Sequence, residues 1–523
     1  MSFPKVEIRP RRSMAFFAFL SIFMVAVSYA FVILLAAACV YLPYLVLEAG
    51  SVNFQIVVLF LFGIVIAGAM LWSMIPRRDK FKAPGLLIER ATQPRLFAEL
   101  ENIAEALNEP MPSEVYLIRD VNAWVADRGG FMGYGCRRVM GLGLPLLSIL
   151  TISQFRAVLA HEFAHYYGGD TSLGPWVFKT QLAIIRTFQN IGSVRKLARI
   201  AVLGIMYLVV ATLMKWYFVV FLRAINLVSR QKEFRADELA CLIAGRQPLI
   251  DGLRSIHGAA MAWPTYWNTE LAPMLNDGAV PAIGDGFARF IAIPTIHEQI
   301  EKSLEKEIQE AKTNPYNTHP PLRDRIAATR KRPAGFLPED PNPARSLLDD
   351  AEALELRFLE SMNPEVKPGT LQCVPWDEVG KRVTIPAWKE FTSEYSSALE
   401  GVTAESLPDQ IPKLRQIGSG IRDPKGRLLD PEQRTRRAAQ LFAAGLGLAL
   451  VDNGWTLQSG PGVFHLQRGQ QELNPFLIVE ELRSRKLTPQ DWIAQCNSLG
   501  IGKLILAPTA PVQLDLLRPS LSS

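Results

Sequence analysis

Residues 151–170 read TISQFRAVLAHEFAHYYGGD, and this stretch decides how the rest of the sequence is interpreted. Thr151 and Gln154 have the spacing of a capping box, which predicts that a helix begins here. The glycine pair Gly168-Gly169 predicts where the helix ends. Between these signals, apolar residues recur at helical spacing. They are Phe155, Val158, Leu159, Phe163 and Tyr166.

This predicted helix carries His161, Glu162 and His165 in the pattern H-E-x-x-H. Residues i and i+4 project from the same face of a helix, so both imidazoles can bind one zinc ion. The intervening Glu162 can then act as the general base on the attacking water. The alternative is an ordinary pair of helix histidines, because the bare pattern also occurs by chance.

Zinc in a hydrolase typically has three protein ligands and one open position, so a further ligand is expected. The candidate is Glu233, which begins the helical stretch Glu233-Phe234-Arg235-Ala236-Asp237. Glu233 and Asp237 share a helix face, so one can bind zinc while the other accepts a hydrogen bond from a ligand histidine. An amphipathic helix with solvated acids is the alternative.

These motifs resemble the family of integral-membrane zinc metallopeptidases that includes HtpX and the CAAX prenyl-protein endopeptidases. That family combines H-E-x-x-H with a later E-x-x-A-D, N-terminal membrane helices, and a Thr-His-Pro-Pro element followed by Arg-Ile. Here the last elements are Thr318-His319-Pro320-Pro321 and Arg325-Ile326. The resemblance covers about residues 80–330 and departs at Ala164, where the family often has Gly. It implies a mainly α fold with a small β-sheet (α+β), a gluzincin-like peptidase domain and one Zn²⁺ per chain.

The resemblance also implies roles for residues outside the metal-binding set. Asn122-Ala123-Trp124 is similar to the family's Asn-Ala-Phe edge strand, along which an extended substrate pairs. His319 would donate a hydrogen bond to the oxyanion, although a turn residue fixed by two prolines is an equally good explanation. Asp237 would orient a ligand histidine. The implied substrates are proteins or peptides, foremost membrane proteins in quality control, with prenyl-peptide processing as the alternative.

Two charge-free apolar runs, residues 14–39 and 54–75, are each long enough to cross a bilayer. The connector between them has no Lys or Arg, whereas both outer flanks are basic. The flanking basic residues are Lys5, Arg9, Arg11 and Arg12 before the first run, and Arg77, Arg78, Lys80 and Lys82 after the second. The positive-inside rule therefore predicts a multi-pass protein of the cell (inner) membrane with its catalytic domain in the cytoplasm. The length of the first run argues against a cleaved signal peptide.

A third apolar run, residues 200–222, is interrupted only by Lys215. If His161, His165 and Glu233 meet at one ion, the chain between them must cross the membrane an even number of times. One possibility is a hairpin whose first arm is residues 176–191. The other is that both helices lie on the cytoplasmic face, because the first arm carries charged residues. The sequence does not distinguish the two.

The composition limits the remaining function classes. The chain has 523 residues, a formal charge of +6 and a pI near 9.0, but no nucleic-acid-binding motif. Its five cysteines never form C-x-x-C, which argues against a disulfide framework or a cysteine zinc site. Two alternatives remain, a proteolytically inactive zinc-binding membrane scaffold and a transporter. The transporter is disfavoured because the first two apolar runs contain no ionisable residue.

The predicted organisation is a membrane anchor (1–80), a metallopeptidase domain (81–332), a linker with a packing helix (333–369) and a C-terminal domain (370–523). A proline-rich stretch from Pro333 to Pro343 marks the boundary. The last domain is predicted to be α+β, with a helix at 436–451, a hairpin around 459–462 and helices on either side of Thr488-Pro489. Its lone His465 is interpreted as structural. Substrate delivery, regulation and oligomerisation all remain open for this domain, and the oligomeric state is not predicted.

Overall fold

The protein is described by a computed structural model over residues 12–50, 53–130, 135–166, 174–194, 201–276, 278–311, 314, 317–332, 335, 337–362, 369, 371–421 and 430–507. It is mainly helical with small sheets, which confirms the predicted fold class. It forms two compact units, Met1–Met261 with Glu298–Ala351, and Ala262–His297 with Glu352–Ser523. Residues 262–297, which the sequence analysis assigned to the peptidase segment, belong to the second unit.

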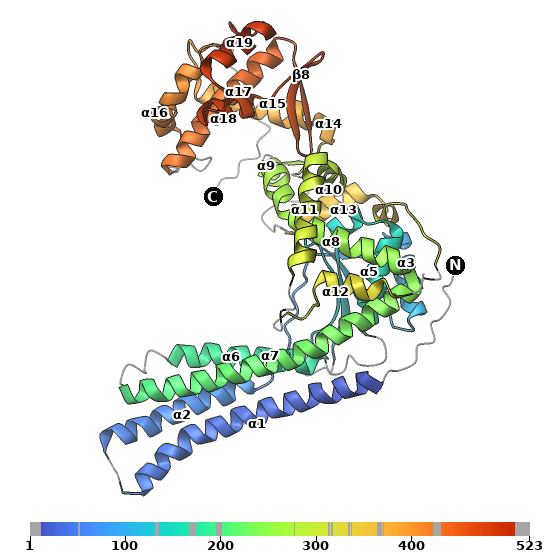
Figure 1. Ribbon diagram of the computed structural model, residues 1–523, viewed down its shortest axis with the longest axis vertical. Helices are drawn as coiled ribbons and strands as arrows, with labels where there is room; N and C mark the ends of the chain where they lie inside the picture. Colours follow the sequence, from blue (N-terminus) through green and yellow to red (C-terminus); the bar gives the residue numbers. More distant parts are fainter. Residues whose placement is uncertain are drawn as a thin grey trace. The chain divides into compact units, whose positions relative to one another are not determined.

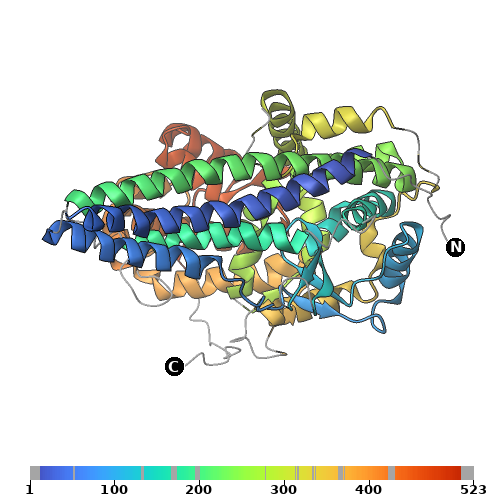
Figure 2. The same ribbon diagram turned by 90° about the horizontal axis from the view of Figure 1, so that it is seen from below.

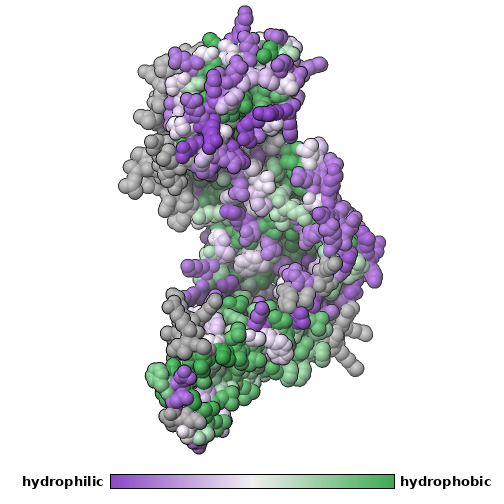
Figure 3. Space-filling model, turned by 60° about the vertical axis from the view of Figure 1, so that its left-hand side comes forward, coloured by the Kyte–Doolittle hydropathy of each residue, from purple (hydrophilic) through white to green (hydrophobic). Residues whose placement is uncertain are grey.

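Four helices of the first unit lie side by side (Figures 1 and 2). They are α1 (Arg12–Glu48), α2 (Phe54–Met74), α6 (Gly174–Val194) and α7 (Ala201–Ala244). Buried apolar residues from all four, among them Val32, Ile66, Ile184 and Phe221, form their shared core. The outer surface of this bundle is also strongly hydrophobic (Figure 3). An apolar surface around an apolar core is the pattern of helices that face lipid.

Within the described residues, three helices are long and apolar enough to cross a membrane: Phe16–Glu48, Phe54–Met74 and Val202–Ala244. The first is longer than the predicted 14–39, because apolar residues continue to Leu47. The polar α6 is not among them, and its Arg186 donates to the carbonyl of Ser73 at 3.1 Å. Whether α6 and α7 form a crossing hairpin therefore stays a prediction. The basic residues Lys5, Arg9 and Arg11 lie outside the described residues.

Helix α7 is one continuous helix of 44 residues. The sequence predicted a helix at 200–222 and a helical stretch that contains Glu233 and Asp237, without predicting that the two are one element. The basic residues between them interrupt the apolar pattern but not the helical hydrogen bonding, because Lys and Arg are good helix formers. The hydrophobic part and Glu233 are therefore parts of the same rigid element.

The first unit also contains a four-stranded sheet in the order β1-β2-β4-β3. Its strands are β1 (Leu86–Ile88), β2 (Glu114–Ile118), β3 (Ala123–Arg128) and β4 (Arg137–Gly143). Strands β2 and β4 are parallel, whereas β1 and β3 pair antiparallel with their neighbours. β3 is thus an edge strand, as predicted.

Helix α5 (Ile152–Ala164) lies against β3 and against α7. The capping box predicted for it is present, with Gln154 N donating to Thr151 Oγ1 at 3.2 Å and Thr151 N donating to Gln154 Oε1 at 3.1 Å. An ion pair of 2.8 Å between Arg156 and Glu99 ties α5 to α3 (Pro94–Ala106). The predicted glycine stop at residues 168–169 lies outside the described residues. The other helices with residues in this unit are α4 (Leu144–Ile149), α8 (Arg246–Tyr266), α11 (Pro294–Glu310) and α12 (Leu322–Thr329), with the 3₁₀ turn η3 (Ala344–Leu347).

The second unit is built around α17 (Pro431–Asp452), which includes the predicted helix at 436–451. The predicted hairpin is confirmed as β7 (Thr456–Gly460) and β8 (Val463–Arg468), and β9 (Gln471–Leu473) completes the sheet. The predicted helices beside Thr488 are α18 (Pro475–Arg483) and α19 (Pro489–Leu499). Further elements are η2 (Trp267–Leu271), α9 (Ala272–Asn276), β5 (Ala279–Val280), α10 (Ile283–Ala292), α13 (Ala351–Met362), β6 (Gln372–Cys373), α14 (Trp376–Val379), η4 (Gly380–Thr384), α15 (Ile385–Glu394), η5 (Ser396–Ala398), η6 (Leu407–Lys413), α16 (Leu414–Ile417) and η7 (Gly418–Gly420).

Candidate metal centre and active site

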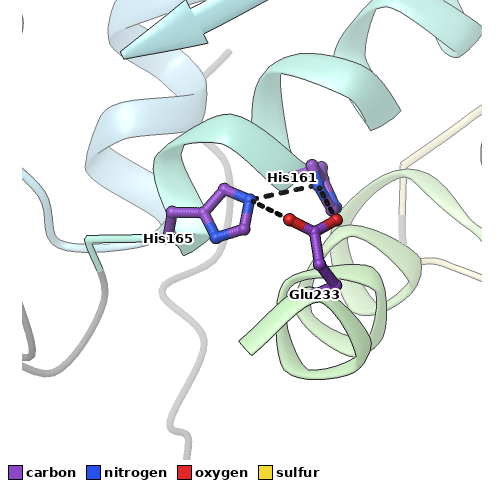
Figure 4. Close-up of side chains that lie close together, drawn as sticks. All are labelled: His161, His165 and Glu233. Atoms are coloured by element: carbon purple, nitrogen blue, oxygen red, sulfur yellow. Dashed lines mark hydrogen bonds and ion pairs between the residues drawn. The ribbon is translucent and has the colours of Figure 1, made fainter. Parts of the chain in front are cut away.

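Helices α5 and α7 bring His161, His165 and Glu233 together (Figure 4). The Nε2 atoms of the two histidines are 3.2 Å apart. Glu233 lies between them, with Oε2 3.4 Å from His161 Nε2 and Oε1 3.4 Å from His165 Nε2. His161 and Glu233 are buried, and His165 is partly buried. The three side chains predicted as ligands therefore converge on one point, although they lie far apart in the sequence.

The geometry of these three side chains fits a zinc ion. Tetrahedral ligands at the usual Zn–N and Zn–O distances lie about 3.3 Å from one another, close to the separations seen here. Glu233 Oε2 is also buried without a well-formed hydrogen bond, although His319 Nδ1 is 3.1 Å away. A buried carboxylate oxygen in this condition is costly unless a cation binds it. Two imidazoles and a carboxylate are a typical donor set for catalytic zinc.

Asp237 lies one helical turn beyond Glu233 and supports His161. Its Oδ1 is 3.0 Å from His161 Nδ1, so the ring can donate there and present Nε2 to a metal. Arg325 in turn donates to Asp237 through Nε at 2.9 Å and Nη2 at 2.6 Å. Burial alone would raise the pKa of Asp237, but the charge of Arg325 and the hydrogen bonds outweigh it and lower the pKa to about 2. Asp237 is therefore ionised in this network.

Glu162 directly follows His161 on α5 and is partly buried. Burial and the charge of Glu233 together raise its pKa to about 7, against the opposing charges of His161, Arg325 and His319. A carboxylate whose pKa is near neutrality can both accept and return a proton at physiological pH. This is the property that a general base in peptide hydrolysis needs.

His319 reaches the same centre from the turn before α12. Its Nδ1 is 3.1 Å from Glu233 Oε2, and the side chain is otherwise largely exposed. The nearby Glu233 carboxylate raises the pKa of His319, although burial opposes the shift. An exposed imidazole beside the metal ligands has room to reorient towards a bound substrate. The structure therefore brings His319 to the site, and its role in the reaction remains a prediction.

The strand predicted to bind substrate also lies beside α5. Ala123 and Trp124 belong to β3, and Asn122 precedes it and accepts a hydrogen bond from Gly143 N at 2.8 Å. The Trp124 ring lies over Gly141 of β4, where an added Cβ would approach it to 2.5 Å. The Trp124 side chain therefore packs on the sheet, and it is the backbone edge of β3 that a peptide can approach.

Sequence reasoning missed the part that Arg325 plays in this centre. The residue was noted only as half of the Arg-Ile element, yet its side chain is buried and links Asp237 with Glu233. The contact joins residues 88 positions apart. No local pattern around Arg325 marks it as buried, so no signal in the sequence alone would have revealed the pairing.

Comparisons with known proteins agree with this centre. Residues 90–333 match the family model "Peptidase family M48". The chain is 26% identical over 222 residues to Protease HtpX of Xylella fastidiosa and 27% identical over 252 residues to Protease HtpX of Mannheimia succiniciproducens. These matches cover 40% and 45% of this chain, and 63% and 82% of the respective relatives. The first match thus spans less than two thirds of that relative. No solved structure gave a significant match.

Proposed function

Residues 90–333 belong to peptidase family M48, and from this premise we infer that the chain is a zinc-dependent endopeptidase anchored in a membrane. His161, His165 and Glu233 bind the metal, and Glu162 is the catalytic base. The observation that carries the proposal is the meeting of the three donor side chains within 4.8 Å of one another. A zinc site that served only the fold would have no use for a carboxylate such as Glu162, whose pKa lies near neutrality.

In the proposed reaction, zinc supplies Lewis acidity, polarising the scissile carbonyl and lowering the pKa of water. Glu162 takes a proton from the attacking water and passes it to the leaving amine. Asp237 holds the ring of His161 in the tautomer that presents Nε2, and Arg325 fixes Asp237. His319 donates a hydrogen bond to the oxyanion. The edge of β3, beginning at Asn122-Ala123-Trp124, aligns the substrate backbone.

The substrates proposed are membrane proteins, cleaved close to the bilayer in quality control. Val220 on α7 is 39% exposed at the end of the apolar run, and Glu233 follows it on the same helix. At 1.5 Å per residue, Glu233 lies about 20 Å along the helix from this exposed apolar side chain. The basic flanks of α1 and α2 favour the cytoplasmic side for this site. Processing of prenylated peptides is the alternative within the same chemistry.

The test compares the wild type with Glu162→Gln in detergent, measuring zinc content and the cleavage of casein and of a membrane protein, each with and without a chelator. The control is Glu101→Gln, a partly buried glutamate of α3 whose carboxylate pairs with Arg90. We expect about one zinc per chain in all three proteins, and loss of cleavage in Glu162→Gln alone. Bound zinc without cleavage of either substrate by the wild type would favour the inactive scaffold instead.

A further inference from the structure

The pairing register of β3 and β4 shows which backbone groups of the edge strand face outward. Asn122 accepts from Gly143 N, so these opposed residues form a hydrogen-bonded pair. In an antiparallel ladder, hydrogen-bonded and non-bonded pairs alternate. The pairs Ala123↔Leu142 and Asp127↔Arg138 are therefore non-bonded, as is Val125↔Met140. The N–H and C=O groups of Ala123, Val125 and Asp127 thus point away from β4, towards the free edge.

The free edge is already engaged at Asp127. The outward-facing backbone N–H of Asp127 lies close to the phenol oxygen of Tyr166 and acts to lower the pKa of that phenol. Tyr166 directly follows the metal-ligand candidate His165, and its side chain is buried. A side chain from the end of the catalytic helix therefore occupies the pairing position after Val125.

The ring of Tyr166 is held in place by a second set of contacts. The Arg138 guanidinium lies 4.0 Å from the ring centroid, a typical cation–π arrangement. Arg138 is itself fixed by Glu109, with Nη1 to Oε2 at 3.0 Å, and lies 3.7 Å from the Asp127 carboxylate. Arg138 and Glu109 side chains are only 15% and 10% exposed, so these contacts are shielded from water. The phenol is therefore pre-organised and does not swing freely over the edge.

We propose that Tyr166 closes the edge of β3 and sets the length of substrate that can pair with it. Ala123 and Val125 remain open to an extended peptide, and the peptide must leave the strand where Tyr166 meets Asp127. This inference rests on the proposed peptidase function and adds a residue that positions and limits the substrate. Because Tyr166 adjoins His165, the point at which pairing stops is also fixed relative to the metal centre.

The test measures peptide binding by the full-length chain on a Glu162→Gln background, where cleavage is removed. Fluorescent peptides of extended sequence are lengthened one residue at a time from either end, and their affinities are measured by anisotropy. Tyr166→Phe on this background frees the Asp127 N–H but keeps the ring beneath Arg138. The matched control is Tyr116→Phe, which removes a buried hydroxyl from the same sheet, where it donates to Glu114 at 2.6 Å on β2.

We expect affinity to stop rising once the peptide covers Ala123 and Val125. With Tyr166→Phe, the longer peptides should gain a further factor of about two to ten, the value of one net hydrogen bond. Tyr116→Phe should retain the original limit. Three outcomes would each overturn the proposal. The dependence of affinity on peptide length could be the same with and without Tyr166→Phe, Tyr166→Phe could weaken all peptides equally, or no peptide could bind at all. Failure of the peptidase function would show separately, as zinc-loaded wild type that binds peptides but does not cleave them.

Discussion

At the crossing of α5 and α7 the first unit buries four ionisable side chains, His161, Glu233, Asp237 and Arg325. The core of the second unit around α17 is instead apolar, built from residues such as Leu446 and large aromatics. Among the described residues of the second unit, Glu355 is the buried charged side chain, and it accepts hydrogen bonds from two backbone N–H groups that begin α10. Both units bury hydrocarbon, but only the first also buries a cluster of mutually paired charges.

The difference separates what stabilises a fold from what performs chemistry. Apolar burial is favourable in proportion to area. A buried network of charges gains little net stability, because desolvation offsets most of the attraction between partners. A cluster of this kind therefore indicates a function that needs it, which agrees with the proposed metal binding and proton transfer. The apolar core of the second unit carries no comparable indication of chemistry.

The largest effect is expected from Arg325→Met. Removal of one member of a buried charge network leaves Asp237 and Glu233 without their cation, so the free energy of unfolding should fall by about 3–5 kcal/mol. Thermal unfolding of the metal-free protein measures the change. The control is Arg323→Met, an exposed arginine on the same helix. If both variants unfold at the same temperature, the charge network contributes little to folding.

Leu446→Ala probes the other side of the comparison. Leu446 is fully buried in the core of the second unit, and the lost transfer energy and the cavity together should cost about 3 kcal/mol. Zinc content should be unchanged, because none of the metal-ligand candidates belongs to that unit. Calorimetry and metal analysis measure the two quantities. Loss of zinc in this variant would show that the units depend on each other for folding.

Asp237→Asn should weaken zinc binding without abolishing it. The neutral amide of Asn cannot replace the negative charge that faces His161 Nδ1. Changes of this kind typically reduce metal affinity about 10- to 100-fold. Competition with a chromogenic chelator measures the affinity. The control is Asp251→Asn on α8. The Asp251 carboxylate accepts a hydrogen bond from the Gln247 side chain and lies outside the metal centre. Equal affinity in the two variants would remove Asp237 from the metal centre.

A smaller and pH-dependent effect is expected at Asp79, which accepts from Arg128 Nε and Gly129 N at 2.9 Å each. The hydrogen bond from Arg128 lowers the pKa of Asp79, so ionised Asp79 stabilises the fold above its ordinary pKa and loses this contribution as the pH falls through the lowered value. Asp79→Asn should cost about 1 kcal/mol at neutral pH. The cost should fade on acidification towards pH 2, as followed by unfolding. A cost that is the same at both pH values would contradict the ionic origin.

Local patterns explain why much of this architecture could be predicted. The i, i+4 spacing of His161 and His165 places both rings on one helix face whatever surrounds it, and the capping box fixes where α5 begins. Glu233 was found because the motif E-x-x-A-D resembles that of a known family. The pairing of Arg325 with Asp237 depends on tertiary contacts, so no local pattern predicted it. The continuity of α7 was missed because hydropathy changes along a helix whose hydrogen bonding does not.

The continuity of α7 also constrains how this protein can vary in length. Each residue of an α-helix turns the chain by 100° and advances it by 1.5 Å. One inserted or deleted residue between Val220 and Glu233 would rotate Glu233 and Asp237 away from α5 together, while leaving the apolar part of α7 in place. Substitutions in this stretch leave the rotation of Glu233 about the helix axis unchanged relative to the apolar part of α7. Insertions and deletions change that rotation. The number of residues in this segment is thus more tightly constrained than their identity.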